Sequence, residues 1–151
     1  MFVKLKTGSL LLLPLLAALL FCTQGVVSAP SLPNPVLQFT GAETVKQGDK
    51  TFNRYHFDVF NKDQFPDEMF APAPTLPPCG KNTKSSRTWI DIYASNGKRL
   101  YGFCALKKSA ELNQIYFDLE EGVVPPSYVY IEMNDRQTNT KYKSNLADTT
   151  Q

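Results

Sequence analysis

The chain has 151 residues, of which 16 are Lys or Arg and 14 are Asp or Glu, so its net charge is +2. Two of the lysines lie in the first 28 residues, and the rest of the chain carries 14 basic and 14 acidic residues. Because nucleic-acid binding depends on a cationic surface that displaces counterions, this balance argues against DNA or RNA as a partner.

The first 28 residues have the layout of a secretory signal peptide. Lys4 and Lys6 form a basic start, an apolar stretch of twelve residues runs from Leu10 to Phe21, and small residues lead to a cleavage point before Ala29. The stretch is shorter than the ~20 residues that span a bilayer, so we expect cleavage and no stable membrane span in the mature chain. An uncleaved anchor is the alternative. The protein is therefore predicted to be exported, to the periplasm or the medium.

The mature chain has the length of one domain. Residues 29–35 are Pro-rich and predict a flexible lead-in, and residues 36–151 are expected to form the folded domain. A short strand is expected at 36–39. The following residues, 41–52, are polar and contain two glycines, which predicts a loop or a weak edge strand.

A half-buried strand is expected at residues 53–60. There Tyr55, Phe57 and Val59 alternate with polar residues, a period of two that is typical of a strand with one face in the core.

Residues 61–87 form a long connection with five prolines and no sustained helical or strand period. Connections of this length are uncommon in compact domains and are usually functional or disordered. The apolar side chains of Phe65, Phe70 and Leu76 argue against disorder. We therefore expect a packed loop with a functional role.

Residues 88–104 predict a β-hairpin that turns at Asn96-Gly97, since Asn-Gly between apolar runs is the strongest short hairpin signal. This turn fixes a register that pairs Trp89 with Cys104, Ile90 with Phe103, Ile92 with Tyr101 and Tyr93 with Leu100. Ile90, Ile92, Tyr101 and Phe103 are then expected in the core, with Trp89 on the opposite face.

Three further strands are predicted by alternation and by flanking turns, at 115–119, 127–133 and 141–146. No segment has the period of a helix longer than one turn. Six or seven short strands and one long Pro-rich loop predict an all-β protein, a β-sandwich of the immunoglobulin or fibronectin type III kind.

Cys79 and Cys104 are the cysteines that remain after signal cleavage, and exported chains meet oxidising conditions. Their bond would hold the long loop across the outer face of the hairpin and cover Trp89. A zinc site would need more ligands, and a nucleophilic thiol would need a nearby base, so both remain weaker alternatives. No metal or cofactor motif is present.

Four further side chains are candidate contact or catalytic groups. Arg87 is expected to hydrogen-bond loop carbonyls, or else to bind an anionic ligand. Tyr128 and Tyr130 point to the outer face if their neighbours point inward, and would form a platform for sugars or peptides or pack across strands. His56 is the only histidine, and it is expected on a solvated strand face; a catalytic base oriented by Asp58 on the same face is the alternative.

The stretch "APAPTLPPCGKNTKSSRTWIDIYASNGKRLYGFCAL", with the later "VYIEMNDR", resembles a group of small secreted proteins, mainly bacterial, of unknown function. The resemblance implies that the Pro-Pro-Cys-Gly segment, Arg87, Trp89 and the segment 102–104 recur together. It implies no activity.

Taken together, the residues predict a secreted, non-catalytic module that recognises a protein or a glycan through the loop 61–87. The candidate contact residues are Phe65, Phe70, Leu76, Arg87, Trp89, Tyr128 and Tyr130. The alternatives are a small hydrolase that uses His56 with a nearby acid, and a structural envelope protein.

Overall fold

A computed structural model describes residues 31–78, 85–104 and 107–150, which belong to the unit Ser31–Gln151. The predicted signal peptide lies outside these residues. The described part contains eight strands: β1 (Leu37–Gln47), β2 (Lys50–Val59), β3 (Thr88–Ala94), β4 (Arg99–Cys104), β5 (Ile115–Glu120), β6 (Tyr128–Asp135), β7 (Thr140–Lys143) and β8 (Ala147–Asp148). It also contains three short 3₁₀ helices: η1 (Lys62–Gln64), η2 (Asp67–Phe70) and η3 (Ser109–Asn113).

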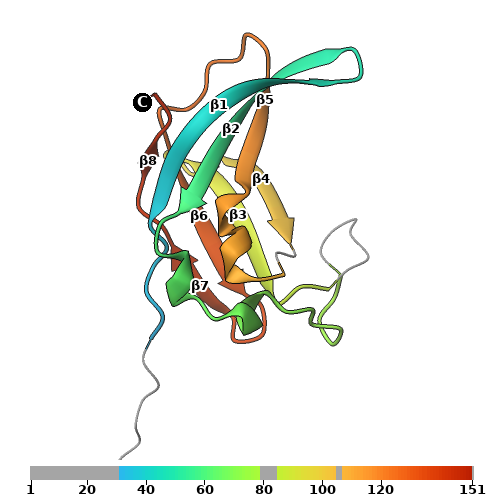
Figure 1. Cartoon of the computed structure of the whole chain (residues 1–151), viewed down its shortest axis with the longest axis vertical. Helices are drawn as coiled ribbons and strands as arrows, with labels where there is room; N and C mark the ends of the chain where they lie inside the picture. The colour runs from blue at the N-terminus through green and yellow to red at the C-terminus, as the bar shows by residue number, and fades with distance from the viewer. Residues whose placement is uncertain (1–30, 79–84, 105–106, 151) are drawn as a thin grey trace, which may run out of the picture. The chain divides into compact units, whose positions relative to one another are not determined.

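The strands form two antiparallel sheets that pack face to face (Figure 1). One sheet has the order β1-β2-β5, and the other has the order β4-β3-β6-β7 with β8 also paired to β6. The predicted all-β sandwich is confirmed. Because β4 pairs with β3 and does not join β5, the order differs from that of constant-type immunoglobulin domains.

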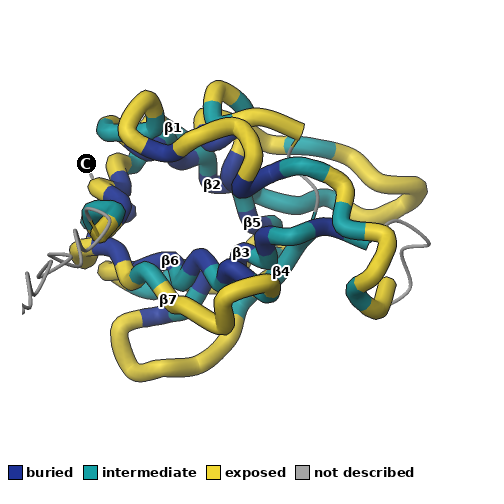
Figure 2. Tube along the Cα trace, turned by 90° about the horizontal axis from the view of Figure 1, so that it is seen from below, coloured by how far each residue is buried: buried dark blue, intermediate teal, exposed yellow. Residues whose placement is uncertain are grey.

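The core lies between the sheets, where buried residues of β2 and β5 face those of β3 and β6 (Figure 2). The predicted alternation in β2 is confirmed, since Tyr55, Phe57 and Val59 are buried and their neighbours are not. The ring of Phe117 on β5 stacks on those of Tyr55 and Phe57, at centroid distances of 5.1 and 5.8 Å. Burial of such aromatic area dominates the stability of a small core.

The hairpin β3–β4 has the predicted register over most of its length. Trp89 lies opposite Cys104, Ile90 opposite Phe103 and Ile92 opposite Tyr101. A bulge then shifts the pairing, so that Tyr93 pairs with Arg99 and not with Leu100. Gly97 in the turn has a φ of +83°, a positive value that glycine adopts without strain, as expected for an Asn-Gly turn.

One predicted core residue of this hairpin is exposed. Ile90 and Ile92 are buried, whereas Tyr101 is 44% exposed. The reason is the sheet order: β4 is an edge strand of the wider, five-stranded sheet, so Tyr101 lies at the rim of the sandwich. Leu100, placed on the outer face by the simple register, packs against the core.

Residues 41–52, expected to be a loop or a weak edge strand, form the paired halves of a long hairpin. β1 continues to Gln47, and a two-residue turn leads to Lys50 on β2. The hairpin extends beyond β5, whose last residue pairs with Phe52 (Figure 1). Of the two expectations, a loop or an edge strand, the edge strand is confirmed, because β1 lies at the edge of its sheet.

The lead-in to β1 is better fixed than its prolines predict. Leu32 packs against the core, and Pro35 is buried. The Asn61 side chain accepts a hydrogen bond from the backbone N–H of Val36 at 2.8 Å and donates one to the carbonyl of Asn34 at 3.0 Å. Contacts with the domain therefore begin before residue 36.

Candidate functional site: the loop between β2 and β3

The loop 61–87 connects the two sheets and carries η1 and η2. Its expected packing is present, because Phe65, Met69 and Phe70 insert into the core. Phe65 and Phe70 are only 2% and 1% exposed. This placement removes both from the candidate contact surface, since neither side chain is available to a partner.

Arg87 ties the end of this loop to β6. Its Nε donates to Asp135 Oδ1 at 2.9 Å and its Nη2 to Asp135 Oδ2 at 2.6 Å, a bidentate pair. Its Nη1 also donates to the carbonyl of Glu68 at 3.5 Å. The expected contact with a loop carbonyl is therefore present, but the main partner is Asp135, 48 residues away in sequence.

The Asp135 side chain is 3% exposed. Burial alone would raise the pKa of this carboxyl, but hydrogen bonds from Arg87, Thr138 and Gln137 outweigh it and hold the pKa below its ordinary value. The same pair raises the pKa of Arg87. Both groups are therefore charged at neutral pH, and Asp135 is a fixed anchor.

Arg136 is a second anchor. Its Nη1 donates to the carbonyl of Ser86 at 2.9 Å and its Nη2 to that of Pro77 at 2.7 Å. Its backbone N–H donates to the carbonyl of Arg87 at 2.9 Å. Adjacent residues at the end of β6 thus hold both the beginning of β3 and the Pro-rich segment.

The two arms of the loop also pair with each other. The N–H of Ala73 donates to the carbonyl of Ser85 at 3.0 Å, and that of Arg87 donates to the carbonyl of Ala71 at 3.3 Å. The hydroxyl of Thr88 donates to the carbonyl of Met69. The segment 71–76 is therefore held in one conformation although it has no regular secondary structure.

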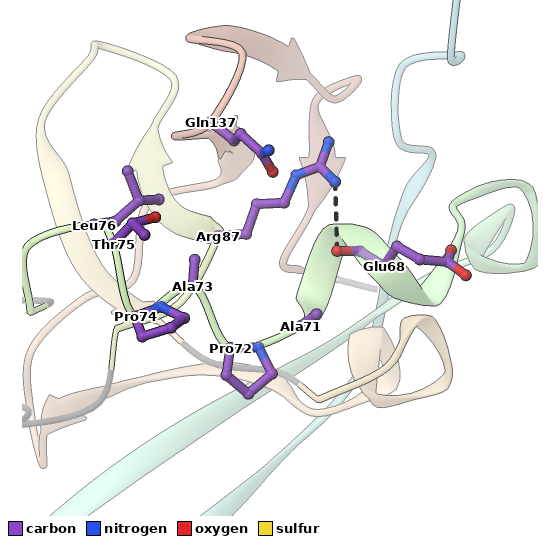
Figure 3. Close-up of a pocket in the computed structure, with 9 residues that line it drawn as sticks. All are labelled: Glu68, Ala71, Pro72, Ala73, Pro74, Thr75, Leu76, Arg87 and Gln137. Atoms are coloured by element: carbon purple, nitrogen blue, oxygen red, sulfur yellow. Dashed lines mark hydrogen bonds between the residues drawn. The ribbon is translucent and has the colours of Figure 1, made fainter.

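A pocket of about 230 Å³ lies beside this segment (Figure 3). The described residues that line it surround the Arg87 side chain and are mostly small and apolar: Glu68, Ala71, Pro72, Ala73, Pro74, Thr75, Leu76, Arg87 and Gln137. Asp135 pairs with Arg87 and Glu68 also lies near it, so the pocket offers no unpaired positive charge to an anion. Of the predicted contact residues, Leu76 and Arg87 belong to it.

Trp89 lies outside this pocket, on the outer face of β3. It is half-buried, and the Arg99 guanidinium lies 5.8 Å from its ring centroid. Cys104 lies opposite Trp89, as predicted. Cys79 lies outside the described residues, so the Cys79–Cys104 bond stays a prediction.

The tyrosine platform on β6 is only partly present. Tyr128 is 45% exposed, but Tyr130 is 8% exposed, because its ring stacks on Tyr93 at 5.3 Å and Lys143 Nζ lies 4.1 Å from its centroid. Cross-strand packing therefore accounts for Tyr130. Tyr116 on β5 lies in the other sheet and does not extend this platform.

His56 has a different acidic partner from the one expected. Its Nε2 lies 3.0 Å from Glu43 Oε1 on β1, whereas both Asp58 oxygens accept hydrogen bonds from Lys62. Among the described residues no serine or threonine hydroxyl is hydrogen-bonded to His56. The pair lies on the open face of a sheet, which gives a catalytic reading little support.

Within residues 31–78, 85–104 and 107–150, no three His, Cys, Asp or Glu side chains cluster as metal ligands would. No helix in this part of the chain is both long enough and apolar enough to cross a membrane.

Comparison with protein-family models, with curated proteins and with solved structures finds no match to this chain. The resemblance stated from the sequence therefore stays a prediction.

Proposed function

We propose that this protein is an exported, non-catalytic recognition module that binds a protein partner through the loop 61–87. The observation that carries this proposal is a long connection, held by Arg87 and Arg136, that leaves the segment 71–76 at the surface beside a pocket. A fixed loop on a rigid scaffold is the usual basis of recognition, because little ordering entropy is lost on binding.

The composition of the pocket favours a protein partner over a glycan. Glycan sites commonly offer an aromatic ring, and no aromatic side chain is among the described residues that line this pocket. Small apolar walls with the amide of Gln137 suit an aliphatic side chain and the peptide group next to it. In this proposal the Cys79–Cys104 bond further restrains the loop, and export brings the module to a surface or extracellular partner.

Selection from a phage-displayed peptide library tests this proposal. We expect peptides that bind the wild type but lose binding to the variant Leu76→Asp, which places a charge at the apolar wall of the pocket. Leu146→Asp is the matched control, because Leu146 is exposed outside the loop. Thermal melting verifies that both variants fold. Failure to enrich any peptide, or equal binding to Leu76→Asp, would contradict the proposal.

A further inference from the structure

A row of aromatic side chains crosses from one sheet to the other at the edge where β4 and β5 lie. The ring centroids of Phe103 and Tyr101 on β4 are 6.1 Å apart, and those of Tyr101 and Tyr116 on β5 are also 6.1 Å apart. The Tyr116 ring lies 4.2 Å from Cζ of Arg54 on β2. We call Phe103, Tyr101, Tyr116 and Arg54 the aromatic rim.

The aromatic rim is open to solvent. Tyr101 is 44% exposed, and its ring plane is inclined by only 23° to that of Tyr116. Tyr101 is the exposed member of the rim, since Phe103, Tyr116 and Arg54 are half-buried and the Arg54 guanidinium lies over the Tyr116 ring. Tyr101 is also the only one of the exposed aromatic residues in the described part that contacts another ring, the others being Phe60 and Tyr128.

Polar groups next to the rim are fixed in place. Arg54 donates to both oxygens of Asp118, at 2.8 and 2.9 Å, and Gln47 Nε2 donates to Asp118 Oδ2 at 2.9 Å. The hydrogen bond with Arg54 holds the pKa of Asp118 below its ordinary value and raises that of Arg54. His56, paired with Glu43, lies beside Tyr116 at a ring distance of 6.1 Å.

We propose that the aromatic rim binds a neutral oligosaccharide. The C–H faces of sugar rings pack on aromatic rings, and their hydroxyls bond to fixed carboxylate and guanidinium groups. Among the described residues, Arg54 is paired with Asp118 and Glu43 is hydrogen-bonded to His56, an arrangement that suits a neutral ligand better than an ion. The surface is open and carries one strongly exposed ring, too little apolar area for a stable protein interface.

This site goes beyond the proposed function, because the aromatic rim shares no residue with the pocket of the loop. The two proposals can therefore fail separately. Leu76→Asp should leave glycan binding intact, and the rim variants should leave peptide binding intact.

Binding of the mature protein to an array of neutral oligosaccharides, followed by NMR titration of each hit, tests the inference. We expect the affinity of Tyr101→Ala to be about five- to tenfold weaker, the loss that follows from one aromatic contact. Tyr101→Phe, which retains the ring, should bind like the wild type. Tyr128→Ala is the matched control, since Tyr128 is equally exposed at 45% but contacts no other ring among the described residues.

Circular dichroism and thermal melting establish that each variant is folded. No binding of any neutral glycan by the wild type would overturn the inference. So would unchanged binding by Tyr101→Ala, or binding of acidic glycans alone.

Discussion

Replacing Arg87 by Met tests whether the buried ion pair with Asp135 fixes the loop. The change keeps most of the apolar stem of the side chain. It removes the two hydrogen bonds that Arg87 donates to the Asp135 carboxylate, with N···O distances of 2.9 and 2.6 Å. Asp135, with a side chain only 3% exposed, would then be a buried carboxylate without its cation. Such groups cost free energy because the protein interior solvates charge poorly.

The structure sets the size of this effect. Removing one partner of a fully buried pair costs about 3–5 kcal/mol. Here the Arg87 side chain is partly exposed, and the backbone N–H of Gln137 still donates to Asp135 Oδ1 at 3.1 Å. We therefore expect the free energy of unfolding at pH 7 to fall by about 2–3 kcal/mol.

The effect should depend on pH in one direction. The folded-state pKa of Asp135 is lowered, so its contribution to stability is fully present above the unfolded pKa, about 4, and is lost as the pH falls through the folded pKa. The difference between wild type and Arg87→Met should accordingly shrink below about pH 4.

Urea denaturation at pH 7 and at pH 3 measures both quantities. Arg99→Met is the control, because the Arg99–Asp91 pair is more exposed and should contribute less than about 1 kcal/mol. In the double variant Arg87→Met/Asp135→Asn the losses should not add, since both remove the same interaction. A loss below about 0.5 kcal/mol for Arg87→Met, or one that grows at low pH, would refute this reasoning.

Two further outcomes are expected from the fold, and a third from the two cysteines. Phe57→Ala should lower the free energy of unfolding by about 3–5 kcal/mol, and Phe60→Ala, three residues later and exposed, by less than about 0.5 kcal/mol in the same urea titration. Gly102→Ala should cost about 1 kcal/mol, because its Cβ would overlap the paired side chains of Arg99 and Asp91 and force them to shift; an unchanged urea midpoint would contradict this clash. If Cys79 and Cys104 are bonded, alkylation without reduction should add no alkyl group, and the intact mass of the mature protein should be two hydrogens below that of the reduced form. Two added alkyl groups would instead show free thiols. The bond should contribute roughly 3–4 kcal/mol to the free energy of unfolding.

The hairpin β3–β4 shows why part of the fold could be predicted from local sequence. Asn96-Gly97 specifies a tight turn, and the turn sets the register from Ile92 back to Trp89. The bulge near Arg99 could not be predicted in this way, because it depends on how β4 packs at the edge of its sheet.

The hairpin β1–β2 shows the opposite case. Its outer half has polar residues on both faces, because it extends beyond the sheet and buries little side-chain area. A period of two arises only where one face is covered, so the alternation signal was absent there. The pairing is instead maintained by the backbone ladder and by the two-residue turn at Gly48.

The candidate site depends on contacts that local patterns do not encode. The sequence indicated that Arg87 fixes the loop, yet its partner Asp135 and the second anchor, Arg136, are brought together only by the pairing of β3 with β6. The apolar residues of the loop indicated packing. Whether Phe65 and Phe70 face the core or a partner could not be decided without the fold.

Site-specific photocrosslinking in the cells that produce the protein tests the central claim most directly. A photoreactive residue at Thr75, on the pocket, should give a crosslinked protein adduct of defined mass that disappears when Leu76→Asp is added. The same residue at Thr44, exposed on β1, should give no such adduct. Adducts of equal yield at both positions, or an adduct at Thr44 alone, would contradict recognition of a protein through the loop 61–87.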